Sequence, residues 1–235
     1  MTRPQDVDAA KLDDISQAPG TLAQRVHRSM KRAILTLDFP PGAVVRKAPI
    51  CDRLGVSRAP VAEAIARLST EGLVDVVPQS ATRVSYFSMD ELREGTFLRQ
   101  ALELATVAEV AESLTDQQQA LLTRNMQSQE QLLADNDVSG FYQADEEFHQ
   151  LLMDFTGYAR LPDVAQLVSL QVSRARMLLL PKPGRLAETL EEHRAIYDAV
   201  IARRPKIAQD AMREHLAKLM PRIEKLQDER PDLFR

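Results

Sequence analysis

A very short connection between two predicted helices restricts the fold of this chain more than any other feature of its sequence. The first of these helices covers about residues 48–54 and ends at Gly55, a residue typical of a left-handed C-cap. One residue further on, Ser57 caps the next helix, and Pro60 lies in its first turn, where a missing N–H costs nothing. Two helices joined through a glycine in this way are typical of a helix-turn-helix.

The sequence on either side of this pair completes a small domain. Before it, a capping box of Thr21 and Gln24 opens a helix with apolar residues at helical spacing, which the Pro-Pro-Gly run at 40–42 stops. After it, residues 73–77 and 83–87 read as two short β-rich strands around a turn. Three helices followed by a two-stranded hairpin predict a winged helix-turn-helix.

The rest of the chain has only helical periodicity. A second capping box, Ser88 with Glu91, marks the domain boundary. Beyond it helices are expected over about 89–113, 116–134, 138–155, 160–179, 186–202 and 206–228. We therefore predict a mainly α fold, an N-terminal winged helix-turn-helix followed by an all-helical antiparallel bundle. The predicted divisions are a flexible tail over 1–20, the winged helix over 21–88, the bundle over 89–228 and a C-terminal tail over 229–235.

The composition excludes a secreted or membrane-spanning protein. Cys51 is the only cysteine, which rules out an internal disulfide framework and suits a reducing compartment. The N-terminal residues lack the apolar core of a signal peptide, and no apolar run approaches the roughly 18 residues of a membrane span. We expect a cytoplasmic protein without a membrane partner.

Charge is distributed unevenly along the chain. The net charge is −4, yet residues 21–88 hold ten Lys/Arg against five Asp/Glu, whereas residues 89–235 hold 18 against 25. A basic module joined to an acidic one is expected when only one part contacts phosphate. The second helix of a helix-turn-helix enters the major groove of DNA. The winged helix is therefore predicted to bind double-stranded DNA.

Candidate DNA contacts lie at the start of this second helix and close to it. Arg58 can fork onto guanine or clamp a phosphate, and Ser57 offers a hydroxyl and a helix N-terminus to the backbone. Taken alone, Arg58 is equally well interpreted as an ordinary solvated arginine. The predicted set is Arg46, Lys47, Ser57, Arg58, Ala59, Pro60 and Arg83.

These residues belong to a longer pattern. The segments 39–42 (FPPG), 54–61 (LGVSRAPV), 63–68 (EAIARL) and 71–73 (EGL) resemble the DNA-binding domain of GntR-family transcription regulators. The resemblance implies a homodimer whose two wings and recognition helices bind a palindromic operator. It also implies repression as the default mode of regulation.

Three positions depart from that pattern. Ala62 stands where the family usually carries Arg, and Ser80 and Ala81 replace the usual Arg and Gly of the wing. The family's glycine lets the backbone approach DNA closely, so we expect the operator sequence or the affinity to differ. Arg83 is placed to compensate from the wing.

Three of the four histidines fall on predicted core faces of the bundle. Asp145 and His149 are four residues apart on one helix and project from the same face, while His193 and His215 each lie in an apolar stripe. For any one of them, a hydrogen-bonded core histidine is the favoured interpretation. Together, three imidazoles and a carboxylate make a good site for a divalent metal, with Zn²⁺ first and Ni²⁺, Mn²⁺ or Fe²⁺ as alternatives.

The bundle also resembles a known domain. The runs 145–149 (DEEFH), 192–196 (EHRAI) and 212–216 (MREHL), with 99–103 (RQALE), are similar to the FCD-type C-terminal domain of the same family. This resemblance implies that Asp145, His149, His193 and His215 hold the metal. It also implies that a small organic acid or sugar acid binds at the metal or beside it. Tyr158 stands where the family often has a further ligand position, so the pocket rim is expected to differ.

Arginines of the bundle are candidates for neutralising such an acid. They are Arg99, Arg174 and Arg176, although the last two are as readily interpreted as surface salt bridges. The predicted function is a DNA-binding regulator, not an enzyme, in which the acid shifts the helices next to the linker around 86–90. The alternatives are a regulator for which the metal is the signal, a metal-dependent hydrolase and, disfavoured by the Asp-x-x-x-His pattern, a lipid or acyl-coenzyme sensor.

Overall fold

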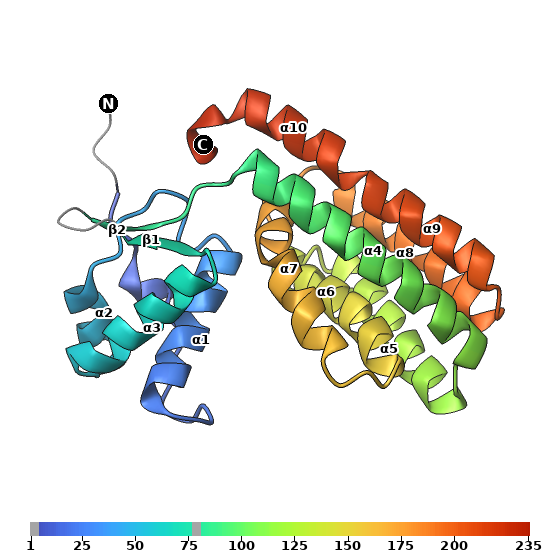
Figure 1. The fold of residues 1–235 in the computed structure, drawn as a ribbon, viewed down its shortest axis with the longest axis horizontal. Helices are drawn as coiled ribbons and strands as arrows, with labels where there is room; N and C mark the ends of the chain where they lie inside the picture. Colours follow the sequence, from blue (N-terminus) through green and yellow to red (C-terminus); the bar gives the residue numbers. More distant parts are fainter. Residues whose placement is uncertain (1–4, 77–80) are drawn as a thin grey trace. The chain divides into compact units, whose positions relative to one another are not determined.

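The structure is a computed structural model that describes residues 5–76 and 81–235 (Figure 1). The chain divides into two compact units: the first joins the residues up to Ser88 with the last six, Arg230–Arg235, and the second is Met89–Glu229. Each unit has its own apolar core. The predicted class, a mainly helical chain with an N-terminal winged helix-turn-helix and a C-terminal helical domain, is confirmed.

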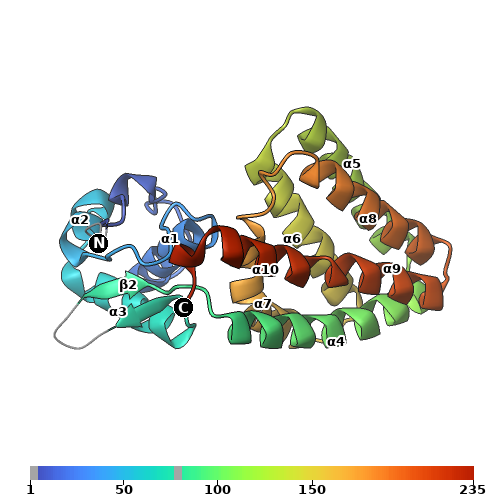
Figure 2. The same cartoon turned by 90° about the horizontal axis from the view of Figure 1, so that it is seen from above.

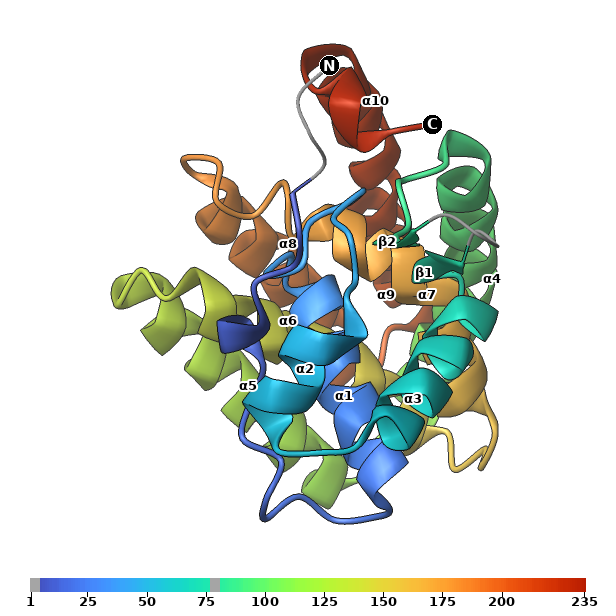
Figure 3. The same ribbon diagram turned by 90° about the vertical axis from the view of Figure 1, so that its left-hand side faces the viewer.

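The helices of the first unit, seen in Figure 3, begin and end at the capping residues that the sequence indicates. The capping box of Thr21 and Gln24 is present, Gly55 closes its helix in the left-handed region at φ 64°, and Ser57 is the N-cap of the next. The two strands pair antiparallel with Val74 opposite Val84. The elements are α1 (Leu22–Leu35), α2 (Lys47–Leu54), α3 (Arg58–Thr70), β1 (Val74–Val76) and β2 (Thr82–Val84).

The predicted flexible tail over 1–20 is wrong for its described part. Val7, Leu12 and Ile15 are buried in the core of the first unit. Val7 also donates its N–H to the carbonyl of Val44 at 2.9 Å. The segment lacks helical or strand periodicity because it is an irregular strip, with apolar side chains between acidic ones, and only the former point inwards. Burial of those side chains outweighs the chain entropy lost.

The predicted C-terminal tail over 229–235 is also wrong, because its last six residues fold onto the first unit. They include a short 3-10 helix (Pro231–Leu233), and Phe234 forms a parallel bridge with Phe87. Leu233 and Phe234 are buried. A segment this short shows no periodicity from which its burial is predictable.

The second unit is entirely helical in its described residues (Figure 2). Its helices match the predictions closely, except that 206–228 divides in two at Lys218 and the helix predicted to reach 179 ends at Arg176. The long first helix packs against the last but one, so the start and end of this unit lie side by side. The helices are α4 (Met89–Ser113), α5 (Asp116–Ala134), α6 (Val138–Phe155), α7 (Leu161–Arg176), α8 (Arg185–Ile201), α9 (Pro205–Ala217) and α10 (Leu219–Glu229).

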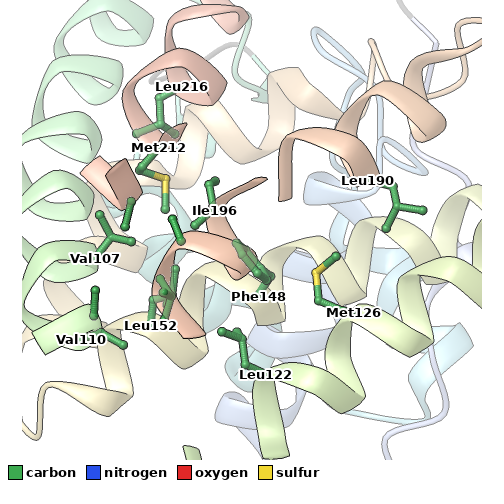
Figure 4. Packing of buried hydrophobic residues seen from close by; sticks show 14 of the residues in the cluster. Val107, Val110, Leu122, Met126, Phe148, Leu152, Leu190, Ile196, Met212 and Leu216 are labelled. Carbon is green, nitrogen blue, oxygen red and sulfur yellow. The ribbon is translucent and has the colours of Figure 1, made fainter. Parts of the chain in front are cut away.

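The bundle core is aliphatic with a few larger side chains (Figure 4). Phe148, Leu152 and Ile196 interdigitate with Met212 near its middle. The Phe148 ring also stacks on His193, with the ring centroids 4.3 Å apart. The apolar core is therefore in contact with a polar centre. Among the described residues, no helix combines the length and the apolar character that crossing a membrane requires.

Candidate functional site

Three histidines from three helices of the second unit meet in one place. His149 on α6, His193 on α8 and His215 on α9 each offer a nitrogen, and these atoms all lie within 4.8 Å of one another. All three side chains are buried. The helices bring together residues that are up to 66 positions apart in the sequence. Within the described parts of the chain, this is the one such group of potential metal ligands.

Two of the three rings are oriented by carboxylates. The Nδ1 of His149 lies 2.6 Å from Glu103 Oε2, and the Nδ1 of His215 lies 2.7 Å from Glu192 Oε2. Burial raises the pKa of Glu103, but the charges of Arg99 and His149 more than offset this and hold it far below its usual range. Glu103 is therefore ionised and can only accept, which places the proton of the His149 ring on Nδ1.

The third ring is oriented through a chain of amides. Asn125 donates from Nδ2 to the carbonyl of Ala144 at 2.9 Å, so its Oδ1 is left to accept from Gln129 Nε2 at 2.7 Å. The Oε1 of Gln129 then faces the Nδ1 of His193 at 2.8 Å. Because that oxygen can only accept, the proton of the His193 ring is also assigned to Nδ1. Partners of this kind fix the tautomer of a metal-binding histidine.

The outcome is three rings whose Nδ1 atoms are all occupied. The Nε2 atoms of His149 and His193 are buried and have no hydrogen-bond partner. Burial lowers the pKa of His193 well below its ordinary value and that of His215 to about 3, so both rings are neutral at pH 7. A buried acceptor that lacks a partner is costly. Converging imidazoles have, in their neutral form, the donor chemistry of a zinc, nickel or related site.

Asp145, the fourth predicted ligand, lies beside the three rings but is not part of the tight cluster. Its side chain is fully buried, and its Oδ1 is 3.4 Å from the Nε2 of His193. Its Oδ2 forms an ion pair with Nη2 of Arg176. The carboxylate of Asp145 is therefore already engaged by a guanidinium group, which a metal ion bound there would have to share.

An arginine-lined pocket borders His215. Its polar lining comes from five helices or their connections, and consists of Arg99, Arg176, Arg185, Thr189, His215 and Arg222. Burial and the charge of Arg99 lower the pKa of Arg176 to about 9, so the guanidinium stays charged at pH 7. Arg222 has a buried Nη1 without a hydrogen-bond partner. Four guanidinium groups around one space suit a small anion, because carboxylates accept paired hydrogen bonds from arginine.

The start of α3 in the first unit exposes the predicted DNA-reading residues. Ser57 has an extended backbone, and its side chain makes no capping hydrogen bond. Arg58 and Ala59 are exposed and Pro60 is half-buried. The hydroxyl and the guanidinium therefore face solvent at a helix N-terminus, where backbone N–H groups attract phosphate.

Other predicted contacts of the first unit are more constrained. Arg46 and Lys47 are exposed at the start of α2, but Arg46 pairs with Asp6 at 2.8 Å. Arg83 is half-buried and donates to the carbonyl of Gly42 at 3.2 Å. Of the positions that depart from the family pattern, Ala62 and Ala81 are half-buried, and Ser80 lies outside the described residues.

Comparisons with known proteins decide the family. Residues 22–84 match the bacterial regulatory proteins of the gntR family, and residues 94–218 match the FCD domain. The chain belongs to the GntR family. It is 28% identical over 211 residues to the HTH-type transcriptional repressor RspR of Escherichia coli, covering 90% of this chain and 92% of RspR. It is 31% identical over 221 residues to an HTH-type transcriptional regulator of Streptomyces ambofaciens, covering 94% and 93%.

Solved structures show the same fold. The chain superposes on Escherichia coli McbR/YncC with a TM-score of 0.78 at 21% identity, covering 88% of this chain and 99% of that one. The protein is thus a transcriptional regulator of the GntR family with an FCD domain, and its relatives include repressors.

Several residues of this GntR regulator's site were not predicted from its sequence. Of the three arginines predicted to neutralise an acid, Arg99 and Arg176 line the pocket, whereas Arg174 is fully buried and donates to Gln171 at 3.1 Å. Tyr158 is 57% exposed. The residues missed are Glu103 and Glu192 as histidine partners, Gln129, and the pocket residues Arg185, Thr189 and Arg222. One usable signal existed, since Glu192 directly precedes His193 and lies seven residues after Arg185, its ion-pair partner.

Proposed function

We propose that this GntR-family protein is a repressor whose affinity for operator DNA is set by a small organic acid bound beside a divalent metal in the FCD domain. One observation carries the proposal. Three imidazoles converge, each with an occupied Nδ1, and the buried Nε2 atoms of His149 and His193 lack a hydrogen-bond partner, next to a pocket lined by four arginines. Burying so many polar and charged groups lowers the stability of a core, and a bound ligand would offset that cost.

The metal would be held by the Nε2 atoms of His149, His193 and His215 and by a carboxylate oxygen of Asp145. Zn²⁺ is the first choice, and Ni²⁺, Mn²⁺ and Fe²⁺ suit the same donors. When bound, the ion supplies a Lewis-acidic position at which a carboxylate or hydroxyl oxygen can replace water. The residues of the chain supply the rest: Glu103, Gln129 and Glu192 keep the rings in the required tautomer.

The effector would be an organic acid or sugar acid small enough for the arginine-lined pocket. Arg99 and Arg176 are paired with buried acids, Glu103 and Asp145, and so are held rigidly. Arg185 pairs with Glu192, and Arg222 pairs with Glu188. A ligand carboxylate would therefore meet preoriented guanidinium groups, which reduces the entropy cost of binding.

The winged helices would act as a pair. Two copies of the chain in a cytoplasmic homodimer would place Ser57, Arg58 and Ala59 into successive major grooves of a palindromic operator. Effector binding and DNA binding must then affect one another by the same factor, usually worth about 1–3 kcal/mol.

A second candidate is a regulator for which the metal itself is the signal. A surface hollow lined by Glu188, Glu191, Glu192 and Glu214 reaches His215. Lys218 and Arg222 also line the hollow and pair with Glu192 and Glu188, so Glu191 and Glu214 would be the acids that attract cations from solution. Reversible metal exchange that alters operator affinity without any organic ligand would favour this candidate.

A thermal-shift screen of sugar acids, hydroxy acids and dicarboxylates tests the proposal. The protein is stripped with chelator, and each acid is added with and without one equivalent of Zn²⁺. An effector at 100 times its Kd should stabilise the zinc-loaded protein by about 2.7 kcal/mol, and Arg99→Ala should remove that gain. The same acid should release a DNA duplex selected on the protein. Stabilisation that is equal with and without zinc, or metal-dependent hydrolysis of the acid, would contradict the proposal.

A further inference from the structure

The last six residues, Arg230–Arg235, are here called the strap. They follow α10, which belongs to the second unit, but they fold as part of the first. Two backbone hydrogen bonds hold them: Phe87 donates to the carbonyl of Leu233 at 3.0 Å, and Arg235 donates to the carbonyl of Phe87 at 2.9 Å. The rings of Phe87 and Phe234 are in contact, with centroids 5.6 Å apart. The chain therefore crosses between its two units twice, after Ser88 and after Glu229.

The strap reaches the base of the wing. The guanidinium of Arg235 lies over the ring of Tyr86, 4.5 Å from its centroid, and pairs with Asp75 in β1 at 3.1 Å. Tyr86 in turn packs so closely on Gly42 that a Cβ there would come within 2.4 Å of its hydroxyl. The strap thus contacts the middle residue of β1, Asp75, and the segment that directly follows β2, at Tyr86 and Phe87.

The other end of this connection lies at the pocket. Arg222 on α10 lines the arginine pocket, pairs with Glu188 of α8 at 2.9 Å and keeps a buried Nη1 without a hydrogen-bond partner. Ile223 and Leu226 are the only buried residues of α10. A helix with so little buried apolar surface is held weakly. Among the described residues, the Arg222–Glu188 pair is one of three ion pairs that tie α10 to other parts of the second unit, and the only one of the three that borders the pocket.

We infer that α10 and the strap form a relay, in which Arg222 senses an anion in the pocket and the strap passes the change to the base of the wing. An anion that takes Arg222 from Glu188 releases or re-anchors α10. The strap is covalently continuous with α10. A shift of α10 therefore weakens or strengthens the two backbone hydrogen bonds between the strap and Phe87. The identity of the anion rests on the proposed function, whereas the mechanical link between Arg222 and Phe87 does not.

Hydrogen exchange of the full chain tests the link without any ligand. The amides of Phe87 and Arg235 should be protected in the wild type, because each donates to a backbone carbonyl. Arg222→Ala should speed their exchange at least about fivefold, the lower end of ordinary coupling. Lys225→Ala is the matched control, since Lys225 lies on the same helix and its side chain is 74% exposed. Equal exchange in the Arg222→Ala variant and the wild type would overturn the relay.

A double-mutant cycle on DNA affinity extends the test to function. The probe is a duplex selected from a random pool on the wild-type chain, and binding is followed by fluorescence anisotropy. In a chain with an intact strap, Arg222→Ala should change the Kd for the duplex at least about fivefold. In a chain with Phe234→Ala and Arg235→Ala, or ending at Glu229, Arg222→Ala should change nothing further. Protection of the α1 amides shows that these variants are folded.

The two experiments distinguish a failure of the relay from a failure of the proposed function. The same change in Kd with and without an intact strap would overturn the relay even if DNA binding is normal. A chain that selects no duplex contradicts the proposed function, and the exchange rates of Phe87 and Arg235 then still decide whether the relay exists.

Discussion

The two units of this regulator differ in the kinds of side chain that they bury. The core of the first unit is apolar apart from His27, which pairs with Glu71, and the cationic residues on α2 and at the start of α3 face solvent. The second unit has an equally apolar core but adds a fully buried set of ionisable groups: Arg99, Glu103, Asp145, His149, Arg174, Arg176, His193 and His215.

This difference matches the size of the two partners. Exposed charges stay hydrated until a large, highly charged partner such as DNA replaces the water, so they cost the folded state little. Buried charges lose their hydration when the chain folds, and this cost is recovered only by pairing or by a ligand. The proposed small ligand, held in a fixed geometry, would recover part of the stability that the second unit loses by burying these charges.

The largest effect is expected when one imidazole of the second unit is removed. His193→Ala should weaken zinc binding by more than about 100-fold, because a ligand has a greater effect than the 10–100-fold typical of its supporting residues. Competition with a chromophoric chelator measures this affinity. His27→Gln is the control, since His27 is equally buried in the first unit but pairs with Glu71 at 2.9 Å. Similar losses in both variants would contradict the assignment of the site to the second unit.

The next effect concerns DNA. Arg58→Ala should weaken binding to a selected duplex by about 5–150-fold, the worth of a good bidentate base contact. Its zinc affinity and its helical content should not change. Arg67→Ala serves as the comparison, because Arg67 is exposed on the same helix but lies in its last turn. A footprint retained at unchanged affinity by Arg58→Ala would remove Arg58 from the reading surface.

A third effect distinguishes a residue that orients a histidine ring from a residue that binds the metal itself. Gln129→Leu keeps the volume of the side chain but removes the acceptor that faces the Nδ1 of His193. Zinc affinity should fall by about tenfold or more, whereas binding to the selected duplex by the metal-free protein should stay the same. A chelator titration compares the two proteins, with Gln131→Leu, an exposed position on the same helix, as the control. No loss of affinity would show that the His193 tautomer does not depend on this amide.

The smallest effect is a pH dependence of the first unit. Burial lowers the pKa of His27, against the opposing charge of Glu71. The unfolded chain therefore takes up this proton first, so the stability is present above pH about 6.5 and is lost as the pH falls towards the folded pKa. Exchange of the α1 amides, corrected for intrinsic rates, should speed up between pH 7 and 5, and less so in His27→Gln. Protection that increases on acidification would contradict this sign.

The parts of the fold that the sequence predicts are those specified by neighbouring residues. Thr21, Gly55 and Ser57 act within one helical turn, so α1, α2 and α3 begin and end close to where they were expected. The spacing of Asp145 and His149 likewise places both on one face of α6, and both are buried. Neither inference requires knowing how the helices pack.

Other features depend on packing that local patterns do not encode. Gln129 is 64 residues from His193, and nothing in the spacing of either indicates that their side chains meet. One local signal that the prediction overlooked is Pro221, which lies in the first turn of α10 and marks the break after α9 at Lys218. The burial of Val7 and Phe234 follows from surfaces created elsewhere in the first unit.

The most direct test of the central claim is a zinc titration of ¹⁵N-labelled protein followed by long-range ¹H–¹⁵N correlation of the imidazoles. The account predicts that the Nε2 resonances of His149, His193 and His215 shift together and saturate at about one zinc per chain. Their Nδ1 atoms should remain protonated and the signals of His27 should not move. Coordination through Nδ1, three independent binding curves, or a response confined to His27 would contradict it.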